Sequence, residues 1–370
     1  MLKFSPAVFA VGREYHIMAE VRCEAFMSVR IGERFYHDEV CGIMRSKTPV
    51  HRVIVPMDIL DEAKNYTVIL TPVEERKPYF TTTAHPREYT FTFRPVPDDD
   101  IYIYHISDAH NRTEEPIIAG KTFGKIDLLV LNGDIIESSN IAQMYSGIYH
   151  ISSELTHGQV PVVFARGNHD MRGSFAEKLI DYIPSQNQKT YYTFRVGGVW
   201  GMVLDCGEDK WDTHEVYNGT VSCHNFRQKQ TDFIKEVIEN AAEEYNHPDV
   251  KHRLIISHNP FTHQMESPFD IEKDIYTSWA SLIREHIKPD FMLCGHTHQR
   301  GIHPVGGSLD ALGHPCLLIF GSEPPECSFI GFGMVLYEEG IELCFTDSNE
   351  NILHKKTISH QKFYSIDDDF

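Results

Sequence analysis

Five apolar runs between residues 101 and 294 are each followed, directly or after one glycine, by aspartate, asparagine or histidine. Each run is continuous and rich in β-branched side chains, which is typical of strands covered on both faces. Helical patterns alternate with the runs, and sheets of that kind place their sites outside the carboxyl ends of the strands. The runs are residues 101–107, 126–132, 160–166, 252–257 and 290–294. They predict an α/β fold with one site where these ends meet.

The side chains that follow the runs are of metal-binding type. In chain order they are Asp108, His110, Asp134, Asn168, His169, Asp170, His258, His296 and His298. A glycine stands before three of these groups, at positions 133, 167 and 295, and permits the tight turn that aims the next side chain. One such pattern means little in a chain with 22 histidines, but five in succession at strand ends predict a shared metal site.

Seven of these side chains are candidate ligands, which is too many for one ion and suits two ions that share a carboxylate. Imidazole and carboxylate favour Mn, Fe, Zn or Co, and we expect the Cys294 thiol to point away. Two ions about 3.5–4 Å apart acidify a bridging water and hold both oxygens of an in-line displacement. Two divalent ions, two aspartates and one hydroxide sum to about +1, which attracts a phosphate.

The segment before residue 97 has a different pattern. Its short runs are rich in Val, Ile, Thr, Tyr and Phe and are separated by Gly, Pro, Asp and Asn, which predicts a small β-sandwich. Residues 94–100, RPVPDDD, hold two prolines and three aspartates that cannot extend a strand. We therefore expect an all-β domain of immunoglobulin or fibronectin type at residues 1–97 and a metal-binding catalytic domain at 98–370.

One helix and one hairpin are the clearest local elements of the second part. Apolar residues at helical spacing predict a helix over residues 225–245, whose apolar stripe belongs to the core. Residues 190–205 predict a hairpin that turns at Gly197 and Gly198. Beyond Cys316, further β-rich runs predict the last strands.

The composition limits the partners that we expect. With 34 Lys and Arg against 53 Asp and Glu, the net charge is −19, which repels long nucleic acids and anionic membranes. No run of 18 apolar residues predicts a membrane span, and no convincing signal peptide begins the sequence. The eight cysteines are scattered without a C-x-x-C, which is typical of reduced thiols. We expect a cytoplasmic protein.

The motif order D-x-H, G-D, G-N-H-[D/E], H and G-H-x-H resembles that of calcineurin-like metallophosphoesterases over residues 101 to about 350. The resemblance implies a four-layer α/β/β/α sandwich. It also implies one metal held by Asp108, His110 and His298, a second held by Asn168, His258 and His296, and Asp134 as the bridge. His169 is implied to face the phosphate and the leaving group as an imidazolium. Its implied partner is Glu137, three positions after the bridging aspartate.

The β-rich segment at residues 66–93 is similar to the sandwich that precedes the catalytic domain of purple acid phosphatases. The chain departs from that group at two positions. Those enzymes carry D-x-G and a tyrosine three residues after the bridging aspartate, where this chain has His110 and Glu137. The resemblance therefore implies an ordinary two-metal site, with Fe, Mn or Zn, and no coloured ferric tyrosinate centre.

The leading hypothesis is metal-dependent hydrolysis of a small phosphomonoester by a hydroxide that bridges the two metals. One alternative is a phosphodiesterase that acts on cyclic nucleotides or other small diesters. Another, from a different class, is a non-catalytic protein-interaction scaffold on the same fold. A scaffold is expected to have lost ligands, whereas all seven are present here.

Three further charged residues lie close to the motifs. Arg172 follows the third strand end and Arg112 follows the first, and a guanidinium fork suits phosphate oxygens. We expect both arginines to bind substrate. Asp170 is expected to orient a metal ligand rather than bind the metal.

Two segments are expected to border the site. Residues 207–226 are long, irregular and contain aromatic side chains, so they are a candidate lid in which His214 and His224 touch the substrate. The N-terminal sandwich is expected to form a second wall, as the resemblance implies. Together they would admit a small phosphate ester and hinder a protein or a nucleic acid.

Overall fold

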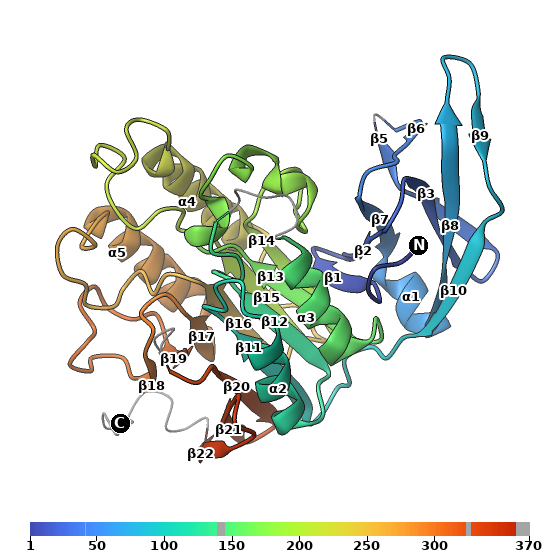
Figure 1. Cartoon of the computed structure of the whole chain (residues 1–370). Helices are drawn as coiled ribbons and strands as arrows, with labels where there is room; N and C mark the ends of the chain where they lie inside the picture. The colour runs from blue at the N-terminus through green and yellow to red at the C-terminus, as the bar shows by residue number, and fades with distance from the viewer. Residues whose placement is uncertain (41, 139–144, 323–326, 360–370) are drawn as a thin grey trace.

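Two large β-sheets lie face to face in the computed structural model, which describes residues 1–40, 42–138, 145–322 and 327–359. The helices α2 (Glu114–Phe123) and α3 (Ser146–Thr156) cover the outer face of the first sheet (Figure 1). The helices α4 (Cys223–Glu239) and α5 (Lys273–Leu282) cover that of the second. The expected four-layer α/β/β/α sandwich is confirmed.

The first sheet has nine strands, and its four central neighbours β11, β12, β13 and β1 run parallel. In spatial order the strands are β22 (Ile352–Ser359), β21 (Gly340–Asp347), β20 (Ile330–Tyr337), β11 (Ile101–Ile106), β12 (Leu128–Asn132), β13 (Pro161–Ala165), β1 (Ala7–Val11), β2 (Glu14–Glu20) and β7 (Val50–Pro56). The first three of the predicted apolar runs are thus β11, β12 and β13, side by side.

The second sheet has six strands, and β15, β16, β17 and β19 run parallel. In spatial order they are β14 (Tyr192–Val196), β15 (Val199–Leu204), β16 (His252–Ser257), β17 (Phe291–Cys294), β19 (Leu317–Gly321) and β18 (Arg300–His303). The remaining two runs are β16 and β17. The predicted hairpin joins β14 to β15, with Val196 opposite Val199 across Gly197 and Gly198.

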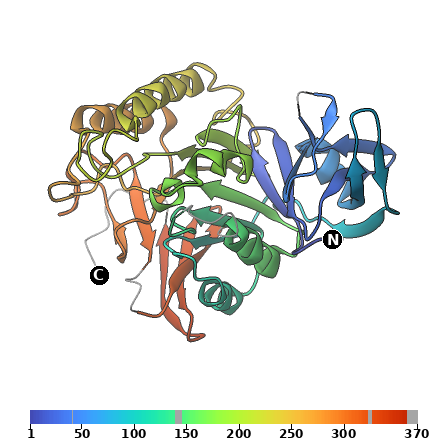
Figure 2. The ribbon, with the colours of Figure 1, turned by 45° about the horizontal axis from the view of Figure 1, so that its top comes forward.

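The N-terminal region is all-β apart from the short helix α1 (Met57–Ala63). A separate sheet in this region contains β10 (Arg87–Thr92), β8 (Asn65–Arg76), β3 (Ala25–Ile31) and β4 (Arg34–His37), with β9 (Thr81–Thr83) paired to β8. A small ribbon joins β5 (Glu39–Val40) to β6 (Met44–Arg45). Figure 2 shows these strands in blue at one end of the sandwich.

One sheet crosses the expected domain division. The N-terminal strand β1 pairs in parallel with β13, where Val8 lies opposite Pro161 and Phe9 opposite Val162. β2 and β7 extend the same sheet, while β3, β4, β8 and β10 form a sheet of their own. The division at residues 97 and 98 stays a prediction about domains, but strands from both sides of it share hydrogen bonds.

Two apolar clusters hold the layers together. The larger one fills the space around the first sheet, and the smaller one lies under α4 and α5 and includes Trp200, Trp279 and Cys294. The buried residues Ile234 and Val237 of α4 belong to the smaller cluster, as its apolar stripe predicts. Cys294 therefore faces the helices α4 and α5, as expected of a thiol that binds no metal.

Helix α4 begins two residues earlier than predicted, at Cys223, and ends earlier, at Glu239. The carboxylate of Asp212 accepts the backbone N–H groups of Cys223 and His224 at 2.9 and 3.1 Å and so caps the first turn. Three further short turns are η2 (His169–Met171), η3 (Ala176–Asp181) and η4 (Ile283–Ile287). No helix in the described ranges is long and apolar enough to cross a membrane.

Candidate metal centre

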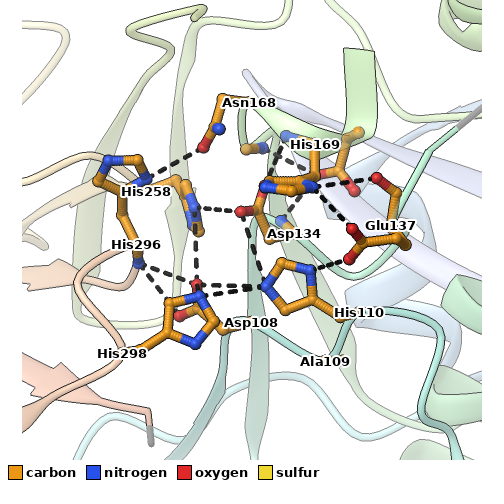
Figure 3. Close-up of polar contacts among 12 residues, drawn as sticks. Asp108, Ala109, His110, Asp134, Glu137, Asn168, His169, His258, His296 and His298 are labelled. Atoms are coloured by element: carbon orange, nitrogen blue, oxygen red, sulfur yellow. Dashed lines mark hydrogen bonds and ion pairs between the residues drawn. The ribbon is translucent and has the colours of Figure 1, made fainter. Parts of the chain in front are cut away.

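The seven predicted ligands come together at one edge of the sandwich (Figure 3). They follow the carboxyl ends of β11, β12 and β13 in one sheet and of β16 and β17 in the other. Asp108 Oδ1 lies 3.6 Å from His298 Nε2, Asp134 Oδ2 lies 3.1 Å from His258 Nε2, and Asn168 Oδ1 lies 3.0 Å from His296 Nδ1. Three groups have possible ligand atoms within 4.8 Å of one another: Asp108, His110 and His298; Asp134, His258 and His296; and His110, Glu137 and His169. The first two match the expected ligands and are called the two ligand groups below.

Five of the seven candidate ligands have a left-handed backbone. Their φ angles are 55° for Asp108, 45° for His110, 51° for Asp134, 72° for His296 and 52° for His298. For a residue other than glycine this conformation costs of order 1–3 kcal/mol, and such residues gather at functional sites. The surrounding sheets must stabilise this conformation, which turns the side chains at the strand ends toward one another.

Two glycines are required by close approach as well as by turn geometry. A Cβ on Gly167 would lie 2.2 Å from Asp134 Oδ1, and a Cβ on Gly133 would lie 2.5 Å from the His258 ring. The φ of Gly133 is +77°, which other residues rarely adopt. The glycines before the ligands therefore make room for the ligand side chains of the neighbouring strands.

His258 is fixed by the backbone of the opposite sheet. Its Nδ1 donates to the carbonyl oxygen of Asn132 at 2.7 Å, which directs Nε2 toward Asp134. The Asn132 amide in turn donates to the carbonyl of Leu293 at 3.0 Å, so one residue ties β12 to β17. Nothing in the sequence marked Asn132, because it lies at an ordinary strand end.

Two buried carboxylates give the site a negative charge. Asp108 and Asp134 are almost fully buried, and their ion-pair partners are imidazoles. Burial lowers the pKa of His258, yet Asp134 and Asp108 outweigh it and raise that pKa to about 10. Burial also opposes ionisation of Asp134, but His258 holds the pKa of Asp134 below its ordinary value. A site that retains two buried carboxylates in this way fits positively charged metal ions well.

Glu137 contacts His110 more closely than His169. Its Oε2 accepts a short hydrogen bond from His110 Nδ1, and its Oε1 lies 3.3 Å from His169 Nδ1. His110 Nε2 is left facing the site, 3.3 Å from His298 Nε2. A carboxylate on the outer nitrogen of a histidine fixes its tautomer and orientation as a metal ligand. The implied pairing with His169 is present, but Glu137 also orients His110.

Comparison with known proteins gives the family. The model of the calcineurin-like phosphoesterases matches residues 101–300, more than half of the chain. The chain belongs to the calcineurin-like phosphoesterase family. It is a phosphoesterase, as the motif order predicted, and its family uses divalent metals. No curated protein matches the sequence.

Two solved structures share the fold of this phosphoesterase. A purple acid phosphatase, PPD1 from yellow lupin (Lupinus luteus) seeds, is 13% identical, with a TM-score of 0.61 over 97% of this chain and 75% of that one. A structure of PhoD is 11% identical, with a TM-score of 0.51 over 97% of this chain and 90% of that one. The alignments include the N-terminal region and confirm the overall architecture.

His169 lies at the site without joining either ligand group of the phosphoesterase. Its backbone N–H donates to Asp134 Oδ1 at 2.8 Å, and its Nδ1 lies 3.1 Å from the carbonyl oxygen of Glu137. Its Nε2 lies 2.8 Å from Nη1 of Arg172. Because a guanidinium can only donate, Nε2 is placed to accept from Arg172. The role of His169 as an imidazolium that faces the leaving group stays a prediction.

The two predicted phosphate-binding arginines both contact the protein. Arg172 donates from Nε and Nη2 to the two carboxylate oxygens of Glu208 at 2.9 and 2.8 Å. Arg112 donates to the carbonyl oxygens of Ala109 and Asp108 at 3.1 and 3.0 Å, and so supports the first ligand turn. Phosphate binding by either arginine stays a prediction. The sequence offered no reason to single out Glu208.

Asp170 orients the bridging aspartate through the backbone. Its Oδ2 accepts the N–H groups of Asp134 and Gly167 at 3.0 and 2.8 Å, and its Oδ1 accepts that of Ile136 at 2.9 Å. It belongs to neither ligand group in the described part of the chain. Its contacts agree with the interpretation as an orienting residue.

A cavity of about 410 Å³ lies beside the ligands, bordered by Asn168, His169 and His296. Its opposite wall is formed by residues 263–266, Phe269 and Leu309, and none of its lining residues comes from residues 1–97. The candidate lid at residues 207–226 contributes Asp209. His214 and His224 do not line this cavity, and His224 Nδ1 instead lies 3.0 Å from the Glu272 carboxylate. The sequence did not indicate the 263–269 wall.

Proposed function

We propose that the protein hydrolyses small phosphate monoesters at a two-metal site. The observation that carries the proposal is the convergence of seven ligand-type side chains around Asp134 from five strand ends. In this proposal Asp108, His110 and His298 hold one ion, Asn168, His258 and His296 hold the other, and Asp134 bridges. When bound, the two ions would supply a nucleophile at neutral pH and positive charge for the phosphate oxygens. Fe, Mn and Zn suit this ligand set.

The side chains of the site have separate roles in the proposed reaction. Asp134 and Asp108 contribute charges that, with the two ions, leave a net positive site for a doubly charged monoester. Glu137 orients His110, and Asp170 orients Asp134. His169 is the residue placed to protonate the leaving oxygen.

Arg172 connects substrate binding to the protonation of His169. In the structure Arg172 Nη1 donates to His169 Nε2. A phosphate oxygen that takes over this Nη1 contact would free Nε2 to carry a proton. The Glu137 carboxylate, 3.3 Å from Nδ1, would then stabilise the imidazolium. The phosphate role of Arg172 and the acid role of His169 are thus parts of one proposal.

The monoester is favoured over the diester on charge and on space. A monoester carries one more negative charge and only one organic group, which suits a positive site beside a cavity of about 410 Å³. The name of the lupin relative, a phosphatase, supports the same choice. Preferred hydrolysis of a diester, as in a phosphodiesterase, is the alternative outcome of the test.

The test compares nitrophenyl phosphate with bis(nitrophenyl) phosphate, which release the same leaving group. We expect a higher kcat/KM for the monoester and no cleavage of duplex DNA. Asp134→Asn serves as the control that assigns the activity to this site. A diester kcat/KM that exceeds the monoester value by about tenfold or more, a transition-state preference of about 1.4 kcal/mol, would overturn the monoester assignment.

A further inference from the structure

A second cavity, of about 280 Å³, also borders His296. Much of its wall is apolar or aromatic, with Phe261, Met265, Phe269, Tyr276 and Leu312, and polar side chains such as Asn259 and Gln264 complete the lining. Phe261 and Tyr276 are buried, and their ring centroids lie 5.6 Å apart. An engineered, fully apolar cavity of about 150 Å³ holds a benzene molecule, so this cavity has room for a larger ring system.

The second cavity borders the same residues as the cavity at the metal centre. Asp209, His263, Met265, Phe269 and His296 line both. His296 is a proposed ligand, so a group bound in the second cavity lies next to the metal centre. The two cavities together therefore form a reaction centre with an apolar extension.

The two carboxylates that line the extension are each paired with a lysine. Asp209 Oδ1 accepts from Lys210 Nζ at 2.7 Å and from the Tyr217 hydroxyl at 3.0 Å. Asp270 accepts from Lys273 Nζ at 3.1 Å. These pairs balance the carboxylate charges of the lining, which disfavours a strongly charged substituent and does not oppose a neutral apolar one.

His263 adds one polar contact to the extension. It is buried, and its Nδ1 has no hydrogen-bond partner in the described part of the chain. Burial, together with His303 and His314, lowers the pKa of His263 to about 4, so the ring is neutral near pH 7. A neutral ring can donate to or accept from an uncharged polar atom of a ligand.

We propose that this extension binds the organic group of the substrate, and that this group is apolar and aromatic or bulky rather than a sugar. The proposal rests on the function proposed above and narrows its substrate class to phosphate esters of neutral aromatic or hydrophobic alcohols. Phe261, Met265, Tyr276 and Leu312 are then the residues that determine specificity. They contact the leaving group, whereas the strand-end ligands contact the phosphate.

The test fills the extension and measures two esters. Leu312 lines the extension but not the cavity at the metal centre. Leu312→Trp should therefore block the extension without altering the cavity at the metal centre. We expect kcat/KM for naphthyl phosphate to fall about tenfold or more, a change of about 1.4 kcal/mol. We expect kcat/KM for glycerol phosphate to stay within about twofold. Comparing each ester with itself removes the difference in leaving-group reactivity.

Two further variants keep the test decisive. Leu353→Trp places the same side chain on the exposed strand β22 and should change neither ester. If Leu312→Trp fails to fold, Ala311→Trp fills the same extension from an exposed neighbouring position. Equal loss on both esters, or no loss on either, would overturn the proposal.

A binding measurement separates this inference from the proposed function. Naphthol should bind the purified wild-type protein in calorimetry, and Leu312→Trp should weaken that binding. Binding of naphthol without hydrolysis of any phosphate ester would support the binding role of the extension and reject the proposed function. Hydrolysis of esters without naphthol binding, and with unchanged ester preference in Leu312→Trp, would reject the extension alone.

Discussion

The two sides of the metal centre are built differently. On the buried side, Asp134, Asn168 and His258 have almost no exposed surface, and the backbone of Asn132 fixes His258. On the open side, His298 is 26% exposed and His110 is held by Glu137, whose side chain is 50% exposed. The same ligand chemistry is thus fixed by packing and backbone on one side and by a solvent-exposed carboxylate on the other.

This difference bears on metal affinity. Backbone contacts in the interior cannot rearrange without disturbing both sheets, whereas the Glu137 side chain can turn into solvent. We therefore expect the ion on the buried side to bind more tightly and to exchange more slowly than the ion on the open side. Variants can test whether the two sides are as independent as this suggests.

The largest effect should come from the residue that the two sides share. Asp134→Asn removes the only carboxylate proposed to contact both ions, so both sides should lose affinity together. We expect kcat to fall by about 10⁴-fold or more, beyond the usual loss of a general acid. Steady-state kinetics and elemental analysis measure the two effects. Asp99→Asn, an exposed aspartate paired with Lys251, is the matched control and should be neutral.

Loss of His169 should separate chemistry from metal binding. His169→Asn removes the proposed proton donor but neither ligand group, so kcat should fall by about 10²–10⁴-fold at unchanged metal content. Lys178→Asn, at an exposed position in η3, controls for the general effect of substitution nearby. If metal is lost with His169, that residue is a ligand and its assigned role is wrong.

A change on the open side alone would sharpen the comparison. Glu137→Gln keeps the shape of the side chain but weakens its hold on His110 Nδ1. We expect a loss of about 10–100-fold in the affinity of one ion, with the other retained, as is typical when the outer partner of a ligating histidine is removed. Metal titration by calorimetry resolves the two ions. Equal weakening of both would show that the two sides are not independent.

The smallest effect concerns packing on the buried side. Gly167→Ala puts a Cβ 2.2 Å from Asp134 Oδ1, so the protein should lose about 1–3 kcal/mol of unfolding free energy. Gly147→Ala, in α3, meets no atom closer than 3.5 Å and should be neutral or slightly stabilising. Denaturant unfolding measures both. Unchanged stability in Gly167→Ala would mean that the Asp134 turn is more adaptable than the structure indicates.

The strand-end ligands could be predicted from the sequence because parallel strands bring their carboxyl ends to one edge. Asp108 and His296 lie 188 residues apart, yet each follows an apolar run and each was assigned to the same edge. Local patterns specify where a strand ends and which side chain follows. They therefore predict the α/β fold and the convergence of the candidate ligands at one edge.

Pairings between distant segments could not be predicted in the same way. The parallel pairing of β1 with β13 joins an N-terminal strand to the catalytic sheet. Nothing in the sequence of β1 indicates which strand it pairs with. Arg172 and Glu208 are of residue types that usually lie on the surface, and the sequence does not pair them. Only the fold brings Arg172 Nη2 to 2.8 Å from Glu208 Oε2. The apolar extension lies in an irregular segment around Phe261 and Leu312, where no periodic pattern marks it.

The central claim is that two ions occupy this centre with Asp134 between them. Crystals grown with Mn²⁺ and measured at the manganese edge test it directly. The account predicts two anomalous peaks about 3.5–4 Å apart. One should lie against Asp108, His110 and His298 and the other against Asn168, His258 and His296, with the Asp134 carboxylate between the peaks. A single peak under saturating metal, or two peaks with Asp134 bound to neither, would contradict it.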